Sequence, residues 1–209
     1  MMNNEIILLG AGGHCISVIE AVESVKDIKI AGILDPVEKK GTLISGYPVL
    51  GDDSLIPLLI KENLSFHITV GQIKDSSIRR KLYNNILNLN GELINIFAAT
   101  SHISKNIKLG TGNSIMHNSF INAGVYIGNN CIINTGAIIE HETIIGDHCH
   151  ISTNATINGQ VEIGNRVFIG SGAVIFNNIK IGDDVIVGAG AVISRDLEHG
   201  TIIYGKTAG

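Results

Sequence analysis

The fold is decided by the stretch INTGAIIEHETIIGDHCHI at residues 133–151, in which an isoleucine stands at every sixth position. The same spacing continues outward in both directions, through sixteen aliphatic residues from Ile103 to Ile193. Four residues after most of them comes a small or β-branched residue, such as Ala137 or Thr143. Neither an α-helix nor a β-hairpin has a period of six. The pattern therefore predicts a chain that turns a corner every six residues and points the aliphatic side chain inward.

A second period of eighteen lies on top of the first. It is marked by glycines that are each followed by Thr, Asn or Asp, and we interpret them as turns that need permissive backbone angles. Eighteen residues are three sixes, so each coil has three flat faces and three corners. This is a hexapeptide-repeat parallel β-helix of about five coils. The glycines are Gly110, Gly128, Gly146, Gly164 and Gly182.

The residues before the repeat alternate between short apolar strands and helices. Such alternation predicts a small parallel α/β domain of the Rossmann-like kind. The period changes between Asn95 and Ile103 without a flexible linker, so we expect one domain at residues 1–97 and a second at 98–209. The expected strands are 5–9, 28–34, 66–70 and 92–97, and the expected helices are 15–25, 55–62 and 77–89.

Composition excludes several classes of function. The net charge of −4 and the lack of a basic stripe argue against a nucleic-acid partner. No apolar run is long enough to span a membrane, and the N-terminal residues lack the pattern of a signal peptide. The three cysteines, Cys15, Cys131 and Cys149, are far apart, which suits reduced thiols in the cytoplasm.

Two motifs together suggest a family. A Gly-x-Gly-Gly-His turn at residues 10–14 opens the α/β domain, and residues 138–147, IIEHETIIGD, are followed by His150. A chain with both resembles the bacterial sugar O-/N-acyltransferases that include the sialic acid O-acetyltransferase NeuD and the UDP-4-amino-sugar N-acetyltransferase PglD. The resemblance covers the whole chain and implies a left-handed β-helix, acetyl-CoA as co-substrate and a homotrimer.

The resemblance also implies roles for residues of the β-helix. His141 would be the general base and Glu142 its support, while Asn134 and His150 would contact the acceptor or the acetyl group. The main-chain N–H of Gly159 would stabilise the oxyanion. The chemistry is reasonable, because a thioester is already activated and histidine titrates near neutrality. A carboxylate beside the histidine could fix its tautomer, and no cysteine or serine stands beside a base, which favours direct transfer.

The remaining assignments concern the two ligands. Gly10, Gly12 and Gly13 form a phosphate-cradle signal of low specificity, placed between a strand and a helix, and Asp35 ends the next strand, where a ribose or base contact would fall. By family resemblance the domain would be a nucleotide-sugar pocket, with His14 reaching toward the sugar. The domain either holds the acceptor or is purely structural. By family resemblance, acetyl-CoA would lie along the C-terminal coils, between neighbouring subunits. The residues that match this site are Gly170, Ser171, Gly188 and Ala189.

Two further patterns have less weight. The run Asp147-His148-Cys149-His150 suggests a metal site, but Cys149 falls on an inward position and the histidine spacing differs from that of carbonic anhydrases on this fold. We therefore expect no metal. The C-terminal residues 204–209 depart from the family's usual ending, with Thr207 in place of a proline.

Three functions are compatible with these patterns. The first is O-acetylation of a sialic acid, free or nucleotide-activated, and the alternative is N-acetylation of a UDP-4-amino sugar. The third is a scaffold that has lost its chemistry, against which the intact His141-Glu142 pair argues. The whole chain resembles the sialic acid branch more closely, so O-acetylation is the expectation.

Overall fold

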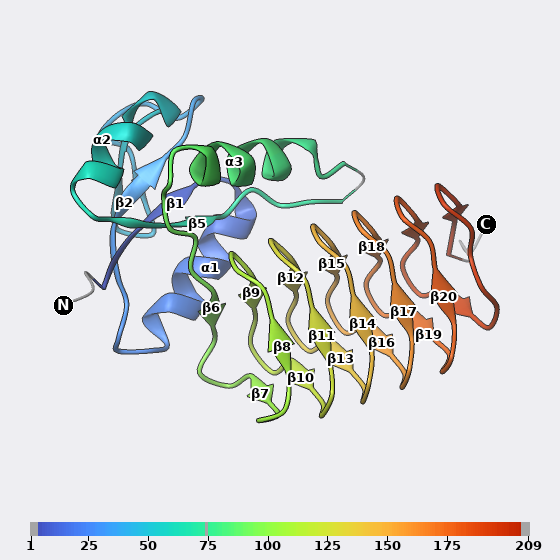
Figure 1. The fold of residues 1–209 in the computed structure, drawn as a ribbon. Coiled ribbons are helices and arrows are strands. Elements are labelled where there is room, and N and C mark those ends of the chain that lie inside the picture. The colour runs from blue at the N-terminus through green and yellow to red at the C-terminus, as the bar shows by residue number, and fades with distance from the viewer. Residues whose placement is uncertain (1–3, 74, 206–209) are drawn as a thin grey trace.

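The computed structural model describes residues 4–73 and 75–205. An α/β domain lies over the first coils of a long solenoid whose coils are stacked along one axis (Figure 1). This confirms the predicted fold class, a Rossmann-like domain followed by a left-handed parallel β-helix. Thr207 lies outside the described residues, as does most of the C-terminal segment. Among the described helices, none is long and apolar enough to cross a membrane.

The α/β domain is a five-stranded sheet with helices on both sides. Its order is β3-β4-β2-β1-β5, parallel except for β3. Both faces of β1 are buried, because Ile6 and Leu8 pack toward α1 while Ile7 and Leu9 pack toward α2 and α3. The elements are β1 (Glu5–Leu9), α1 (Gly13–Glu23), β2 (Lys29–Leu34), β3 (Leu43–Ile44), β4 (Tyr47–Gly51), η1 (Asp53–Leu55), α2 (Ile56–Lys61), β5 (Ser65–Ile68) and α3 (Ser77–Asn88).

Three details of this domain differ from the sequence expectation. The hairpin β3–β4 was not expected, and its turn uses Ser45 and Gly46, both with positive φ. Helix α1 begins two residues earlier than expected, at Gly13. Of the expected strand 92–97, Leu93 forms an isolated parallel bridge with Phe66 of β5, and only Ile96–Phe97 (β6) forms a strand, which pairs with β9 of the solenoid.

The β-helix has three faces, each a stack of two-residue parallel strands. The first face holds β7 (His102–Ile103), β10 (Phe120–Ile121), β13 (Ile138–Ile139), β16 (Thr156–Ile157), β19 (Val174–Ile175) and β22 (Val192–Ile193). The second holds β8 (Lys108–Leu109), β11 (Tyr126–Ile127), β14 (Ile144–Ile145), β17 (Glu162–Ile163) and β20 (Lys180–Ile181). The third holds β6, β9 (Ser114–Ile115), β12 (Ile132–Ile133), β15 (His150–Ile151), β18 (Phe168–Ile169), β21 (Ile186–Val187) and β23 (Ile202–Ile203).

The inward positions are occupied as the period predicted. From Ile115 to Ile193 every sixth residue is buried, and so are the small residues at the second position, Thr143 among them. Each fully buried isoleucine contributes about 1.5–3 kcal/mol relative to leaving it exposed. The corner between the first and second faces is called the first corner below, that between the second and third faces the second corner, and that between the third and first faces the third corner.

The glycines of the eighteen-residue period have a different role from the expected one. None of the five has a positive φ; the left-handed angles at the corners belong to other residues, such as Asn130 and His148. A Cβ on Gly146 would lie 2.7 Å from the carbonyl oxygen of Gly164 in the next coil. The glycines are therefore needed for close stacking of the coils at the second corner.

Candidate functional site

His141 and Glu142 lie side by side at the first corner. Their side chains are 55% and 61% exposed, and His141 Nδ1 lies 3.3 Å from Glu142 Oε2. Since a carboxylate only accepts, this contact places the imidazole proton on Nδ1 and leaves the lone pair on Nε2. The pair therefore has the arrangement that a general base requires, with the lone pair on Nε2.

Gly159 lies directly beneath His141, one coil farther along the chain. A Cβ built on Gly159 would stand 2.6 Å from His141 Nε2 and 2.7 Å from Cε1, so only glycine leaves room for the ring. The N–H of Gly159 donates to no acceptor among the residues that the structure describes. The donor expected for an oxyanion is thus free and close to the expected base.

The glycine-rich turn joins β1 to α1. Gly10 has a φ of 108°, and a Cβ there would lie 2.6 Å from Val70, so the fold itself requires this glycine. A Cβ on Gly12 or Gly13 would meet nothing within 4 Å. These two residues open α1 onto free space at its N-terminus, where main-chain N–H groups favour an anion.

Asp35 binds the turn from the end of β2. Its Oδ2 accepts from the N–H of Ala11 at 2.8 Å, and its Oδ1 accepts from the N–H groups of Val37 and Glu38. Although burial opposes the shift, these backbone donors lower the pKa of Asp35. The carboxylate is ionised and holds the turn in place.

His14, in the first turn of α1, points into a buried cluster of basic side chains. Burial, reinforced by the charge of Arg79, lowers the pKa of His14 well below its usual value. Its Nε2 atom is buried and has no hydrogen-bond partner among the described residues. A buried nitrogen without a protein partner beside an open glycine turn is a polar group that a bound molecule could satisfy.

Asn134, at the third corner, and His150, on the third face, lie close together. Asn134 Nδ2 is 3.2 Å from His150 Nε2, and the opposite nitrogen of His150 contacts the carbonyl oxygen of Gln72. Burial lowers the pKa of His150 to about 4, so its ring is neutral near pH 7. A Cβ on Gly71 would lie 3.6 Å from His14 Cβ, and the next residue, Gln72, contacts His150, so both histidines lie beside this loop at the junction of the domains.

The four residues expected to bind acetyl-CoA also lie at the third corner. Gly170 and Gly188 lie where a Cβ would collide with the backbone of the next coil, at 2.5 Å from Ala189 N and Gly205 N respectively. Coil stacking alone therefore accounts for these two glycines. Ser171 and Ala189 are exposed, and Ser171 Oγ lies 2.9 Å from Ser152 Oγ.

The expected site residues thus form two groups within one chain. His141, Glu142 and Gly159 occupy the first corner, whereas Asn134, His150 and the glycine turn lie around the third corner and the domain junction. The two corners are the two edges of the first face. A single subunit does not bring the expected base to the expected acceptor contacts.

Sequence reasoning missed the residues that hold the two domains together. The fully buried Arg79 donates to the carbonyl oxygens of Ile68 and Val70 and, at 2.6 Å, to Oδ1 of Asn130 in the β-helix. His67 contacts Ser114 Oγ at 2.8 Å. Arg79 could have been found, because it shares a helical face with Leu82, Tyr83 and Ile86.

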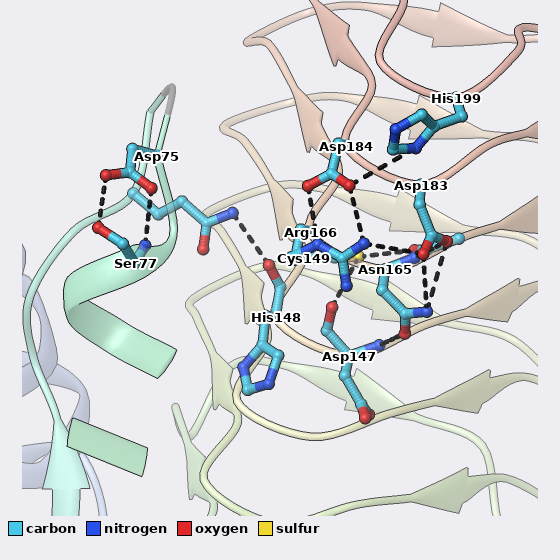
Figure 2. Close-up of polar contacts among 12 residues, drawn as sticks. Asp75, Ser77, Asp147, His148, Cys149, Asn165, Arg166, Asp183, Asp184 and His199 are labelled. Atoms are coloured by element: carbon cyan, nitrogen blue, oxygen red, sulfur yellow. Dashed lines mark hydrogen bonds and ion pairs between the residues drawn. The ribbon is translucent and has the colours of Figure 1, made fainter. Parts of the chain in front are cut away.

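The loop before α3 also reaches the β-helix. Gln72 Nε2 donates to the carbonyl oxygen of His148 at 2.9 Å, at the second corner. On the coils beyond, Arg166 forms a bidentate pair with Asp184 and also donates to Asp183 (Figure 2). The Arg166 contacts hold neighbouring coils together. Among the described residues, no group of three or more His, Cys, Asp or Glu could hold a metal ion.

Comparisons with known proteins agree with this architecture. Residues 5–86 match the family model of the PglD N-terminal domain. Residues 107–141 match the hexapeptide repeat of succinyl-transferase, and residues 142–177 and 161–195 match the bacterial transferase hexapeptide. A search of curated proteins gave no match.

Solved structures are similar over nearly the whole chain. A variant of perosamine N-acetyltransferase from Caulobacter crescentus, in complex with CoA and GDP-perosamine, is 33% identical, with a TM-score of 0.90 over 96% of this chain and 93% of that one. The acetyltransferase domain of PglB from Neisseria gonorrhoeae, in complex with acetyl coenzyme A, is 29% identical, with a TM-score of 0.90 over 97% of both chains. WeeI from Acinetobacter baumannii, 23% identical over 96% of both chains with a TM-score of 0.81, shares the fold.

Proposed function

The chain belongs to the NeuD/PglD family of sugar acyltransferases, and from that premise we propose that it transfers the acetyl group of acetyl-CoA to the amino group of a nucleotide-linked amino sugar. One observation carries the proposal: a perosamine N-acetyltransferase, solved with CoA and GDP-perosamine, matches both domains at 33% identity. The comparisons support the alternative of N-acetylation better than the sialic acid O-acetylation that the sequence analysis expected. An amino sugar is therefore the proposed acceptor.

The proposed chemistry rests on the first corner. Acetyl-CoA would supply an activated thioester carbonyl. The acceptor nitrogen would attack the thioester carbonyl carbon while His141 Nε2 takes the proton that the amine must lose, and Glu142 holds the opposite nitrogen and stabilises the imidazolium. The C–S bond would then break, and CoA would leave as its thiol with the proton that the imidazolium returns. The free N–H of Gly159 would donate to the carbonyl oxygen as negative charge develops there. All three cysteines are buried in the cores, away from these residues, so direct transfer is favoured over an acyl-enzyme.

The proposed acceptor site is at the domain junction. The open N-terminus of α1 at Gly12 and Gly13 suits the phosphates of a nucleotide-linked sugar. His14 supplies the unpartnered Nε2 that a bound ligand would satisfy. Asn134 and His150 lie farther along the same side and would face the sugar, and Asp35 holds the turn.

A homotrimer would bring the two groups of residues together. On the first face the outward side chains include Phe120, Ile138, Val174 and Val192, and Val192 is 61% exposed. The second face is mixed, because the exposed Tyr126 and Ile144 share it with charged side chains, among them a Lys180–Glu162 pair at 3.1 Å. Three copies that pack their apolar first faces around an axis would set the first corner of one subunit against the third corner of the next. His141 would then face the partner subunit's acceptor site, and acetyl-CoA would lie between them along Gly170, Ser171, Gly188 and Ala189.

An acceptor assay tests the proposal. The purified chain is incubated with acetyl-CoA and either a GDP- or UDP-linked amino sugar, the same sugar without its nucleotide, sialic acid or CMP-sialic acid. Thiol release is followed, and the acetylated product is identified by mass spectrometry. We expect turnover with a nucleotide-linked amino sugar. In the cell, the reaction would take place in the cytoplasm. Turnover with sialic acid or its CMP derivative alone would restore the O-acetylation hypothesis.

A further inference from the structure

Gln160 follows Gly159 in the chain. It lies over Glu142 in the same way that Gly159 lies over His141, eighteen residues and one coil farther along. Gln160 lies one coil beyond Glu142, and its Nε2 donates to Glu142 Oε2 at 3.0 Å. This is the same oxygen that lies 3.3 Å from His141 Nδ1. The backbone is tied in the same way, because the N–H of Gln160 donates to the carbonyl oxygen of His141 at 2.9 Å.

Glu142 is held from the other side by the preceding coil. A Cβ on Gly124 would lie 3.2 Å from Glu142 Cγ, so the carboxylate side chain packs over this glycine. The N–H of Glu142 donates to the carbonyl oxygen of Ala123 at 3.0 Å. Gly124, Glu142 and Gln160 are eighteen residues apart, so they lie in one column along the first corner, and all three have positive φ.

We propose that Gln160 is a positioning residue, which fixes the Glu142 carboxylate against His141 and thereby sets the tautomer of the base. Glu142 is 61% exposed, and an exposed carboxylate without a tether samples several rotamers. An amide donor orients the carboxylate without cancelling its charge, so the full negative charge still acts on His141. A lysine at this position would neutralise that charge. The inference rests on the proposed function, since it needs His141 as the base.

The test compares Gln160→Ala with Asn178→Ala. Asn178 is the next residue in the same column, it is exposed, and its φ is 58°, so both variants place alanine in the same backbone conformation. We expect Gln160→Ala to lower kcat about tenfold, as for loss of the partner that orients a functional group. Both KM values should stay within twofold, and Asn178→Ala should behave as the wild type.

Two readouts separate positioning from a structural effect. The acid limb of the pH profile of kcat/KM should move to lower pH in Gln160→Ala, because the carboxylate drifts away from His141. It should move to higher pH in Gln160→Glu, which adds a negative charge. In a Glu142→Ala background, Gln160→Ala should have no further effect, since nothing remains to be positioned.

The outcomes distinguish this inference from the proposed function. If His141→Ala and Glu142→Ala lower kcat while Gln160→Ala matches Asn178→Ala, only the positioning role is refuted. The positioning role is also refuted if Gln160→Ala lowers kcat by the same factor in the wild type and in a Glu142→Ala background. If His141→Ala keeps wild-type kcat, the proposed mechanism fails first. Thermal unfolding of each variant checks that the fold is intact.

Discussion

Gly159→Ala perturbs the proposed base without changing its chemistry. The new Cβ would lie 2.6 Å from His141 Nε2, whereas an ordinary contact is 3.4–4 Å, so the ring must move by about 1 Å. A misplacement of about 1 Å in a reacting group can cost about 10²-fold in rate, or about 3 kcal/mol of activation free energy. Because the ring is 55% exposed, it can swing toward solvent, and we expect the fold to keep its stability.

The assay is steady-state thiol release with saturating substrates, together with thermal unfolding. We expect kcat to fall about 10²-fold while the unfolding midpoint changes by a few degrees at most. Gly146→Ala is the matched control, because its Cβ would collide with the backbone of the next coil and should lower stability instead. The reasoning is refuted if Gly159→Ala keeps at least a third of wild-type kcat. It is also refuted if the variant loses the same factor in a His141→Ala background, where no ring is left to displace.

Four other outcomes follow from the same structure. His141→Ala should lower kcat by about 10²–10⁴-fold, the range for a lost general base, and Glu142→Ala should lower it less; near-wild-type turnover of His141→Ala at neutral pH would contradict the mechanism. Val174→Glu places a charge on the apolar first face and should convert a trimer to monomers without activity, as measured by sedimentation; a fully active wild-type monomer would argue against the interface. Gly12→Leu should raise the acceptor KM while acetyl-CoA binding is unchanged, as titration calorimetry can check. Equal losses of affinity for both ligands would refute the assignment of the acceptor to the glycine turn and of acetyl-CoA to the β-helix. Burial lowers the pKa of His67 to about 4, so the unfolded chain binds a proton below about pH 6.5 that the native state does not bind until about pH 4. The free energy of unfolding should therefore fall as the pH drops across that window, by up to about 3 kcal/mol for this residue. In urea unfolding, the difference in this free energy between pH 7 and pH 5 should be smaller in His67→Gln than in the wild type.

Local patterns in the sequence were enough to predict a parallel α/β domain followed by a β-helix, whereas the left-handedness of the β-helix came from the family resemblance. The six-residue period predicts the buried isoleucine stacks because each repeat buries its aliphatic side chain against the same position of the next coil, whatever else the chain does. The roles expected for His141, Glu142 and Gly159 came from the family resemblance, and the repeat explains only why Gly159 lies one coil beyond His141: a regular solenoid places residues eighteen apart directly above one another. The regularity of the repeat thus converts sequence spacing into spatial proximity.

The α/β domain was less predictable in its details. The hairpin β3–β4 depends on Gly46 and on pairing with the existing sheet edge, and no periodicity marks two short strands of this kind. Residues 92–97 have the composition of a strand, but Ile96 found its partner in β9 because the chain had already entered the solenoid. In both places, the pairing partner decided the structure.

Only the tertiary structure could show which residues join the domains and which glycines serve the coil stacking. Arg79 bonds to Asn130 across fifty-one positions, a contact that depends on how the two domains dock. Likewise, the tether from Gln160 to Glu142 depends on side-chain rotamers at a corner, and Gly146 is needed for an approach between backbones rather than for a turn. The sequence by itself determined the repeating core and the residues in register with it, because these follow from periodic burial. Contacts between the two domains required the three-dimensional packing, since no period relates them.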